Sequence, residues 1–187
     1  MRLVLSTRNA HKVREFAGLL DGVDVAPLPG DVQLPPETGE TFAENALVKA
    51  RTAAAATGGP AMADDSGIES AALGGAPGVR SARFAGEHAT DEENLAKLLR
   101  EAPAGSALAY VCAIAYVDGE EERLFEGRCT GTLAAEPRGD GGFGYDPAFL
   151  PDDIGDGRTM AELAPAEKDA ISHRGRAAAL LRAWLPG

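Results

Sequence analysis

Apolar positions in the first half of the chain occur in two patterns, short unbroken runs and runs with helical spacing. The runs Arg2–Ser6, Val23–Leu28 and Pro60–Ala63 are short and apolar, and each predicts a strand. Apolar residues recur every three to four positions in Lys12–Leu20 and in Thr41–Thr57, so both segments predict helices. This half of the chain therefore predicts alternating strands and helices.

The second half predicts a different arrangement. Residues 74–89 predict a long irregular loop, and Thr90–Ala102 predicts an amphipathic helix. Two apolar segments, Ala107–Val117 and Arg123–Leu133, flank Asp118-Gly119, a dipeptide typical of hairpin turns. The C-terminal segment again shows helical spacing. Helices that connect strands early in the chain and a hairpin later predict an α/β fold with one mixed sheet.

Composition and charge narrow the range of partners. The 187 residues suffice for one domain or for two small lobes that fold as a unit, and 44 % apolar residues supply a core. Eighteen basic against 29 acidic residues give a net charge of −11, which excludes duplex DNA binding through counterion release. Aromatic residues make up only 5 %, which argues against a stacking surface for single-stranded nucleic acid. A nucleotide ligand is compatible with this net charge, provided that a metal ion and local cations offset the repulsion between its phosphates and the acidic protein.

Two further features bear on where the protein works. No apolar run approaches the roughly 20 residues of a membrane span, and the charged sequence after Ser6 is unlike a signal peptide. Cys112 and Cys129 lack the spacing of metal ligands, although a hairpin over 107–132 could bring them face to face. We expect reduced thiols in a cytoplasmic protein without a membrane partner. Only four of the 18 basic residues are lysines, so each lysine is of interest.

The first candidate site is Ser6–Lys12, between the first predicted strand and the first predicted helix. Backbone N–H groups at a helix N-terminus, with hydroxyl groups and a lysine beside them, form an anion site. The alternative is that Thr7 or Asn9 simply caps the helix while Lys12 is solvated. The segment lacks the glycines of a Walker A loop or of a dinucleotide fingerprint.

Three carboxylates are candidate metal ligands. Thr41-Phe42-Ala43-Glu44 matches a capping box, which alone explains Glu44, but a carboxylate in the first turn of a helix can also hold Mg²⁺. Asp64 and Asp65 follow an apolar strand, where α/β sheets place their chemistry. Side chains of adjacent residues on an extended chain point to opposite sides, so one aspartate could bind metal while the other orients or accepts a proton. An Asx turn with Gly67 is the alternative.

Two clusters lie closer to the C-terminus. The glycine-rich segment Gly141–Pro147 carries two aromatic side chains, so it could wrap a flat ring or form a plain turn. Lys168 and Ser172 share a helical face, whereas His173 and Arg174 do not. One straight helix could not direct all of them at one ligand. We therefore expect a helix break near Ser172, with Ser172 capping the last helix.

Together, these residues resemble the inosine triphosphate pyrophosphatase family, the XTP/dITP diphosphatases that hydrolyse non-standard purine nucleoside triphosphates. The resemblance runs from residue 6 to about residue 181 through STRNAHKVREF, ETGETFAENALVKA, ADDSGIESAALGGAPGVRSARFAG, GGFGYDPAFL and EKDAISHRGRAAALL. Each motif is modest alone, but five in family order do not arise by coincidence.

The resemblance implies a single domain over residues 1–187 with an elongated, two-lobed α/β fold, a central mixed sheet flanked by helices, and an active-site cleft between the lobes. It also implies a homodimer and Mg²⁺ as cofactor. Glu44 and Asp65 would bind the metal, with Asp64 as a further candidate, and Asp65 would accept a proton from water. The implied substrate-binding residues are Thr7, Arg8, Asn9, Ala10, His11, Lys12, Ser66, Phe143, Gly144, Tyr145, Asp146, Lys168, His173 and Arg174.

The implied reaction is hydrolysis of ITP, dITP or XTP to the monophosphate and pyrophosphate, which would clear deaminated purine nucleotides before polymerases incorporate them. Lys12 and helix N–H groups would neutralise the phosphates together with Mg²⁺. A donor such as Arg174, or a backbone N–H near Phe143, would favour the 6-oxo group over an amino group. The rival hypotheses are a pyrophosphatase of the same fold acting on TTP or UTP, a phosphatase of monoesters and a non-catalytic nucleotide sensor.

Overall fold

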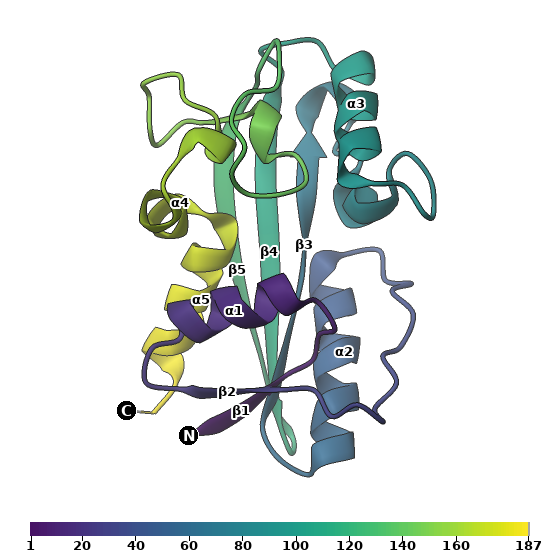
Figure 1. Ribbon diagram of the computed structural model, residues 1–187. Coiled ribbons are helices and arrows are strands. Elements are labelled where there is room, and N and C mark those ends of the chain that lie inside the picture. Colours follow the sequence, from purple (N-terminus) through teal and green to yellow (C-terminus); the bar gives the residue numbers. More distant parts are fainter. Residues whose placement is uncertain (187) are drawn as a thin grey trace. The chain divides into compact units, whose positions relative to one another are not determined.

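The computed structural model describes residues 1–186, which form two compact units. Unit 1 consists of Met1–Asp65, Cys112–Gly127 and the chain from Arg174 on, and unit 2 consists of Ser66–Val111 and Arg128–His173. The strands are β1 (Arg2–Leu5), β2 (Asp24–Pro27), β3 (Ala61–Ser70), β4 (Ala107–Asp118), β5 (Glu121–Leu133) and β6 (Phe149–Pro151). The helices are α1 (Ala10–Leu19), α2 (Phe42–Thr57), α3 (Asp91–Glu101), α4 (Pro165–Ile171) and α5 (His173–Trp184) (Figure 1).

The strands form one six-stranded sheet in the order β2-β1-β3-β4-β5-β6. Strand β1 pairs in parallel with β2 and β3, whereas β6 pairs antiparallel with β5. The predicted mixed α/β sheet is therefore confirmed. Strands β3, β4 and β5 contribute residues to both units. The single domain, and the cleft that the resemblance implies, stay predictions.

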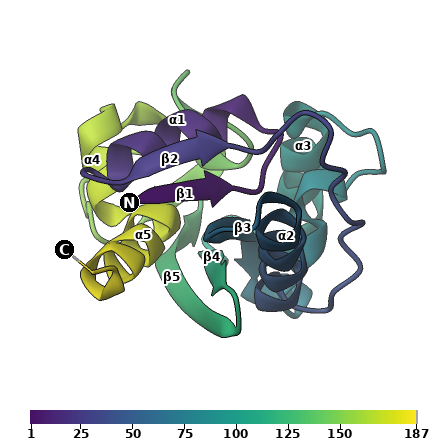
Figure 2. The ribbon, with the colours of Figure 1, turned by 90° about the horizontal axis from the view of Figure 1, so that it is seen from below.

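In unit 1, alternate residues of a strand face different helices. Leu3 of β1 lies in one buried cluster with Phe16 of α1 and Leu181 of α5. Its neighbour Val4 lies in another cluster with Ala53 of α2. The pleat of the strand explains this division, because successive side chains point to opposite faces of the sheet. Helices α1 and α5 therefore cover one face of this part of the sheet, and α2 covers the other (Figure 2).

The same alternation continues along β3, which is longer than the sequence predicts. Met62 packs on the side of α1 and α5, and Ala61 and Ala63 pack on the side of α2. The predicted end of the strand at Ala63 is wrong, and so is the alternative of an Asx turn with Gly67, since β3 continues through Asp64 and Asp65 to Ser70. Neighbours on both sides, β1 and β4, supply pairing for β3 that no local sequence signal reveals.

Unit 2 has its own core, to which Ile68 of β3, Leu98 of α3 and Phe149 of β6 contribute. Strand β6 is only three residues long, and no local pattern in the sequence predicts it. Its partner Gly131 has to be a glycine, because a Cβ there would overlap the backbone oxygen of Leu150 and the ring of Phe149. The predicted hairpin of β4 and β5 is confirmed, and the expected loop over residues 74–89 contains one 3-10 helix, Gly78–Arg83.

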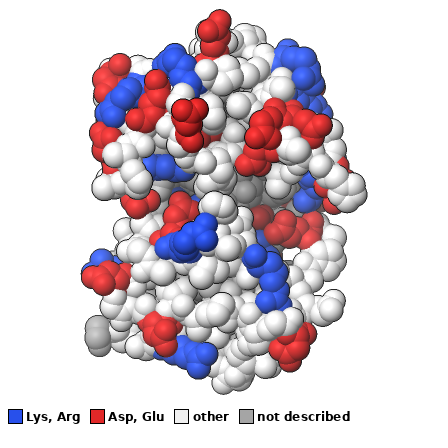
Figure 3. All heavy atoms as spheres, in the orientation of Figure 1, with Lys and Arg blue, Asp and Glu red and all other residues white. Residues whose placement is uncertain are grey.

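The cysteines, the lengths of the helices and the surface charges complete the description of the fold. Cys112 and Cys129 are both buried and do not form a disulfide with each other. Among the helices that the structure describes, none is long and apolar enough to cross a membrane. On the face drawn in Figure 3, basic side chains lie among acidic ones rather than gathering in one patch.

Candidate active site

The N-terminus of α1 is capped by Asn9. Its Oδ1 accepts hydrogen bonds from the backbone N–H groups of His11 (2.8 Å) and Lys12 (3.4 Å), and Thr7 Oγ1 accepts one from Asn9 N (3.1 Å). The capping alternative is thus confirmed for Asn9. The same alternative expected a solvated Lys12, and this part is wrong, because Lys12 Nζ lies 2.8 Å from Asp64 Oδ2. A phosphate role for Thr7–Lys12 stays a prediction.

Asp64 sits in a buried network of charges. Besides Lys12, its Oδ2 contacts Arg174 Nη2 (3.5 Å), and Arg174 Nη1 contacts Glu15 Oε2 (2.6 Å). The side chains of Asp64 and Arg174 are 0 % and 2 % exposed. Burial opposes ionisation of Asp64, but the charges of Lys12, Arg174 and Lys49 outweigh burial and hold its pKa well below the ordinary value. Asp64 is therefore a fixed negative charge.

Asp65 faces α2, on the opposite side of β3. Its Oδ2 accepts a hydrogen bond from Asn45 Nδ2 (2.9 Å), and its Oδ1 lies 3.4 Å from Lys49 Nζ. Burial raises the pKa of Asp65, and Glu37 raises it further, while Lys49 opposes the rise without cancelling it. Lys49 Nζ also contacts Glu37 Oε1 at 2.6 Å. Two adjacent carboxylates thus have pKa values displaced in opposite directions, the pattern that separates a proton acceptor from a permanent anion.

Glu44 completes the capping box that its sequence pattern predicts. Its Oε2 accepts hydrogen bonds from Glu40 N (2.7 Å) and Thr41 N (3.2 Å), and Thr41 Oγ1 accepts one from Glu44 N (3.1 Å). Glu44 Oε1 has no hydrogen-bond partner within the described part of the chain, and the residue is exposed. The capping role is confirmed, and a metal role stays a prediction.

The carboxylates of unit 1 suit a hard cation that takes only one or two of its ligands from the protein. Asp65 and Glu37 both contact the ammonium group of Lys49, so oxygen donors here already flank a positive charge. Within residues 1–186, no three side chains of His, Cys, Asp or Glu gather into a metal-binding group. Mg²⁺ needs no such group, because it binds through one or two carboxylates together with phosphate oxygens and water.

In unit 2, Asp146 organises the glycine-rich segment. Its Oδ1 accepts a hydrogen bond from Tyr110 OH (3.0 Å), and its Oδ2 accepts bonds from Lys168 Nζ (2.6 Å) and Phe143 N (2.9 Å). A Cβ on Gly142, which has a φ of +73°, would overlap the Asp146 carboxylate. The Asp146 carboxylate therefore holds the segment in one shape.

The two aromatic side chains of this segment differ in exposure. Tyr145 is 5 % exposed, and its hydroxyl donates to Ser81 O at 2.7 Å. Phe143 is 42 % exposed, and Lys168 Nζ lies 4.8 Å from the centre of its ring. Tyr145 thus behaves as the buried aromatic of a plain turn, whereas Phe143 is exposed. Gly144 N donates to Asp91 Oδ2 at 2.9 Å.

The predicted helix break is confirmed. Helix α4 ends at Ile171 and α5 begins at His173, while Ser172 between them is extended (φ −64°, ψ 149°). The His173 ring stacks on Tyr110 with centroids 4.8 Å apart, so His173 joins Asp146 and Lys168 in unit 2. Arg174 joins the Asp64 network of unit 1. Ser66 is half-buried in β3.

Several residues of these networks were not singled out by the sequence analysis. Lysine scarcity is the one signal that could have found Lys49, since three of the four lysines (Lys12, Lys49 and Lys168) contact Asp64, Asp65 and Asp146. No comparable signal marks the others, because their contacts join distant parts of the chain. These residues are Glu15, Glu37, Asn45 and Tyr110.

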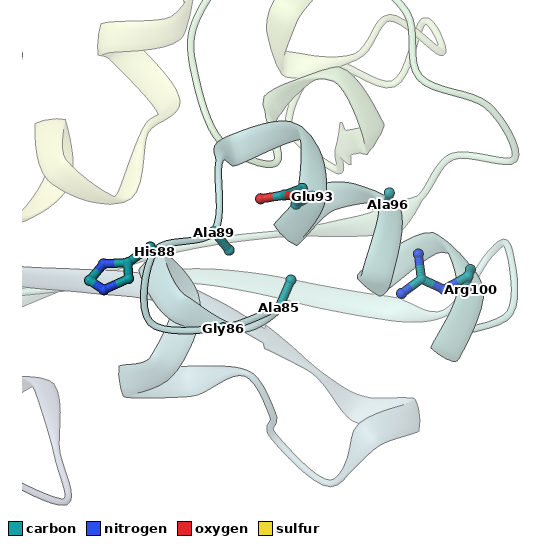
Figure 4. A pocket seen from close by; sticks show the side chains of 7 residues that line it. All are labelled: Ala85, Gly86, His88, Ala89, Glu93, Ala96 and Arg100. Carbon is teal, nitrogen blue, oxygen red and sulfur yellow. The ribbon is translucent and has the colours of Figure 1, made fainter.

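Unit 2 also has a hollow elsewhere, between the loop before α3 and the helix itself (Figure 4). None of the residues predicted for the site lines it. The lining residues are Ala85, Gly86, His88, Ala89, Glu93, Ala96 and Arg100.

The fold and site define an α/β protein with strand-borne aspartates among lysines, a setting suited to phosphoryl chemistry. The Ham1 family model matches residues 3–184, and the chain belongs to the Ham1 family. This membership confirms the resemblance drawn from the sequence.

Relatives and solved structures agree. A dITP/XTP pyrophosphatase from Mycobacterium tuberculosis is 50 % identical to this chain, with 96 % of this chain and 93 % of that protein covered. A protein of the same name from Symbiobacterium thermophilum is 52 % identical, with 99 % and 95 % covered. The structure of a HAM1 protein from Coxiella burnetii matches with a TM-score of 0.89 and 42 % identity, covering 98 % of this chain and 97 % of that one.

Proposed function

We propose that this protein hydrolyses the non-canonical purine nucleoside triphosphates ITP, dITP and XTP to the monophosphate and pyrophosphate, as a nucleotide-pool sanitising enzyme. The observation that carries the proposal is the contrast between Asp64 and Asp65, in a chain whose relatives are named dITP/XTP pyrophosphatases. A non-catalytic sensor would need no such contrast, because binding alone requires no proton acceptor.

Asp65 is the proposed proton acceptor for the attacking water. Its raised pKa makes it the stronger base of the pair, and Asn45 and Lys49 fix the directions of its two oxygens. Asp64 stays ionised and keeps Lys12 in place. Backbone N–H groups of Thr7–Lys12 and the side chain of Lys12 are the proposed phosphate contacts, with Lys12 supplying the positive charge.

Asp65 and Glu44 are the proposed metal ligands, with Glu37 and Asp64 as further candidates. Mg²⁺ bound there would add positive charge against the triphosphate. Asp65 already lies against one cation, and Glu44 keeps its Oε1 available while its Oε2 caps α2. The donor set therefore fits the ion that the family resemblance implies.

The remaining predicted residues are proposed to recognise the nucleoside. The exposed ring of Phe143 would stack on the purine, next to Gly144, Tyr145 and Asp146, and Lys168 and His173 would border it. Ser66 and Arg174 are further proposed contacts. Arg174 is held by Glu15 and Asp64, so it would read the 6-oxo group with an N–H donor that these two carboxylates do not use.

The test is pyrophosphate release from ITP, dITP, XTP, GTP, ATP, TTP and UTP, first with Mg²⁺ and then with a chelator. Metal-dependent release from the first three, with the others far slower, is the expected result. Faster release from TTP or UTP would favour the rival pyrophosphatase, and orthophosphate as the product would favour a phosphatase. Binding without turnover would identify a sensor.

The family resemblance also supports a cytoplasmic homodimer that acts on small-molecule nucleotides, without nucleic-acid or membrane partners. Light scattering on the purified protein measures the oligomeric state. A mass that stays at one chain over the accessible concentration range would contradict the dimer.

A further inference from the structure

Arg8 lies inside the segment predicted to bind phosphate, yet its guanidinium group is turned onto the main chain of another loop. The acceptors all belong to the loop that joins β2 to α2, which we call the 28–41 loop. Arg8 donates to the backbone oxygens of Leu28 (3.0 Å), Pro29 (2.8 Å), Gly30 (3.4 Å) and Val32 (2.5 Å).

The shape of the guanidinium group suits this arrangement. It is planar and carries five N–H donors in a fixed fork, whereas a lysine ammonium group is a compact point charge. Every acceptor is a main-chain carbonyl oxygen, so the contact fixes the path of the backbone whatever side chains the loop carries. The loop also turns tightly at this place, where Val32 N donates to Pro29 O at 3.2 Å.

The other end of the same loop meets the partners of Asp65. Glu37 contacts Lys49 Nζ at 2.6 Å, and Gly39 N donates to Asn45 Oδ1 at 2.8 Å. The backbone at Gly39 packs closely against Asn45, because a Cβ there would lie 2.7 Å from Asn45 Oδ1. Lys49 and Asn45 are the two residues that hold the oxygens of Asp65.

We propose that Arg8 is a positioning residue, which holds the start of the 28–41 loop so that Glu37 and Gly39 meet Lys49 and Asn45 and fix the orientation of Asp65. Its side chain acts through the loop and does not bind the triphosphate. The kinetic part of this inference rests on the proposed function, and the structural part does not.

Three variants test the assignment: Arg8→Ala, Arg8→Lys, and Arg182→Ala as a control for loss of an exposed arginine of unit 1. In hydrogen exchange on the ligand-free protein, we expect the amides of Val32 and Gly39 to exchange faster in both Arg8 variants than in the parent protein. In the control, their exchange rates should not change. Binding of inorganic tripolyphosphate, the probe for a phosphate contact, is expected to stay within about twofold of the parent protein in all three.

The kinetic expectation follows from a misplaced proton acceptor. With ITP, kcat of both Arg8 variants should fall by about tenfold or more while KM stays within about twofold. Unchanged exchange together with weaker tripolyphosphate binding in Arg8→Ala, restored in Arg8→Lys, would make Arg8 a phosphate ligand and overturn the inference. Faster exchange with unaltered kcat would also overturn it. If the parent protein itself releases no pyrophosphate from any nucleotide, the proposed function fails, and the exchange data still decide whether Arg8 holds the loop.

Discussion

At the scale of single residues, adjacency along a strand places Asp64 and Asp65 in opposite surroundings. Asp64 contacts cations from α1 and α5, and Asp65 contacts an amide and an ammonium group from α2. The two carboxylates belong to adjacent residues of the same strand, so the difference in their pKa values comes from the helices on each face of the sheet. A substitution at each residue therefore tests a different role.

Asp65→Asn should remove the proton acceptor and keep the side chain's shape. We expect kcat for ITP to fall by about 10² to 10⁴-fold. Equilibrium binding of ITP should persist, because the proposed phosphate contacts lie at the N-terminus of α1 and just before it. Steady-state kinetics and calorimetric binding measure the two quantities. Turnover equal to that of the parent protein would remove Asp65 from the mechanism.

Lys168→Ala is the corresponding test in unit 2. The change removes the contact with Asp146 and the cation from above the Phe143 ring. We expect KM for ITP to rise by about tenfold or more, with a smaller change in kcat, since the proposed role is in binding. Lys97→Ala is the matched control, because Lys97 also lies over an aromatic ring, that of Phe84, outside the predicted site. Equal KM values for the two variants would contradict the role of Lys168.

At the scale of elements, the N-terminus of α2 combines a cap with a proposed ligand. Thr41→Ala removes only the cap and should lower the free energy of unfolding by about 1 kcal/mol. Glu44→Gln keeps an oxygen that can accept hydrogen bonds, so it should cost less stability but raise the Mg²⁺ concentration needed for half-maximal activity. Thermal unfolding and Mg²⁺ titrations, measured side by side on both variants, separate the two roles. An unaltered Mg²⁺ requirement in Glu44→Gln would contradict the metal role of Glu44 and leave capping as its role.

The elements also show how far the sequence could predict this molecule. Local patterns were sufficient for α2, for the β4–β5 hairpin and for the break at Ser172, because each depends on residues close together in the chain. They were insufficient for the continuation of β3 past Ala63 and for β6, since neighbouring strands supply the pairing of both. The site follows the same division: motifs marked the aspartates, while Lys49 and Glu37 reach Asp65 only through the fold.

At the scale of the whole molecule, Asp64 couples the stability of unit 1 to pH. The pKa of Asp64 in the folded protein lies below its ordinary value, so the unfolded chain binds the proton more tightly. Ionised Asp64 therefore stabilises the folded state above its ordinary pKa of about 4, and this contribution is lost as pH falls further. At neutral pH, loss of the charge would leave Lys12 without its counterion and buried Arg174 with Glu15 alone, which costs about 3 to 5 kcal/mol.

We expect the free energy of unfolding of Asp64→Asn to be much lower than that of the parent protein at pH 7. This difference should shrink as pH falls from about 4 towards 2. Urea unfolding followed by the fluorescence of Trp184, the single tryptophan, measures it in unit 1, where both residues lie. Asp156→Asn is the control: it removes the same charge from an exposed aspartate of unit 2, and its effect on this signal should stay small at every pH. A stability difference for Asp64→Asn that does not depend on pH would show that its packing, rather than its charge, stabilises unit 1.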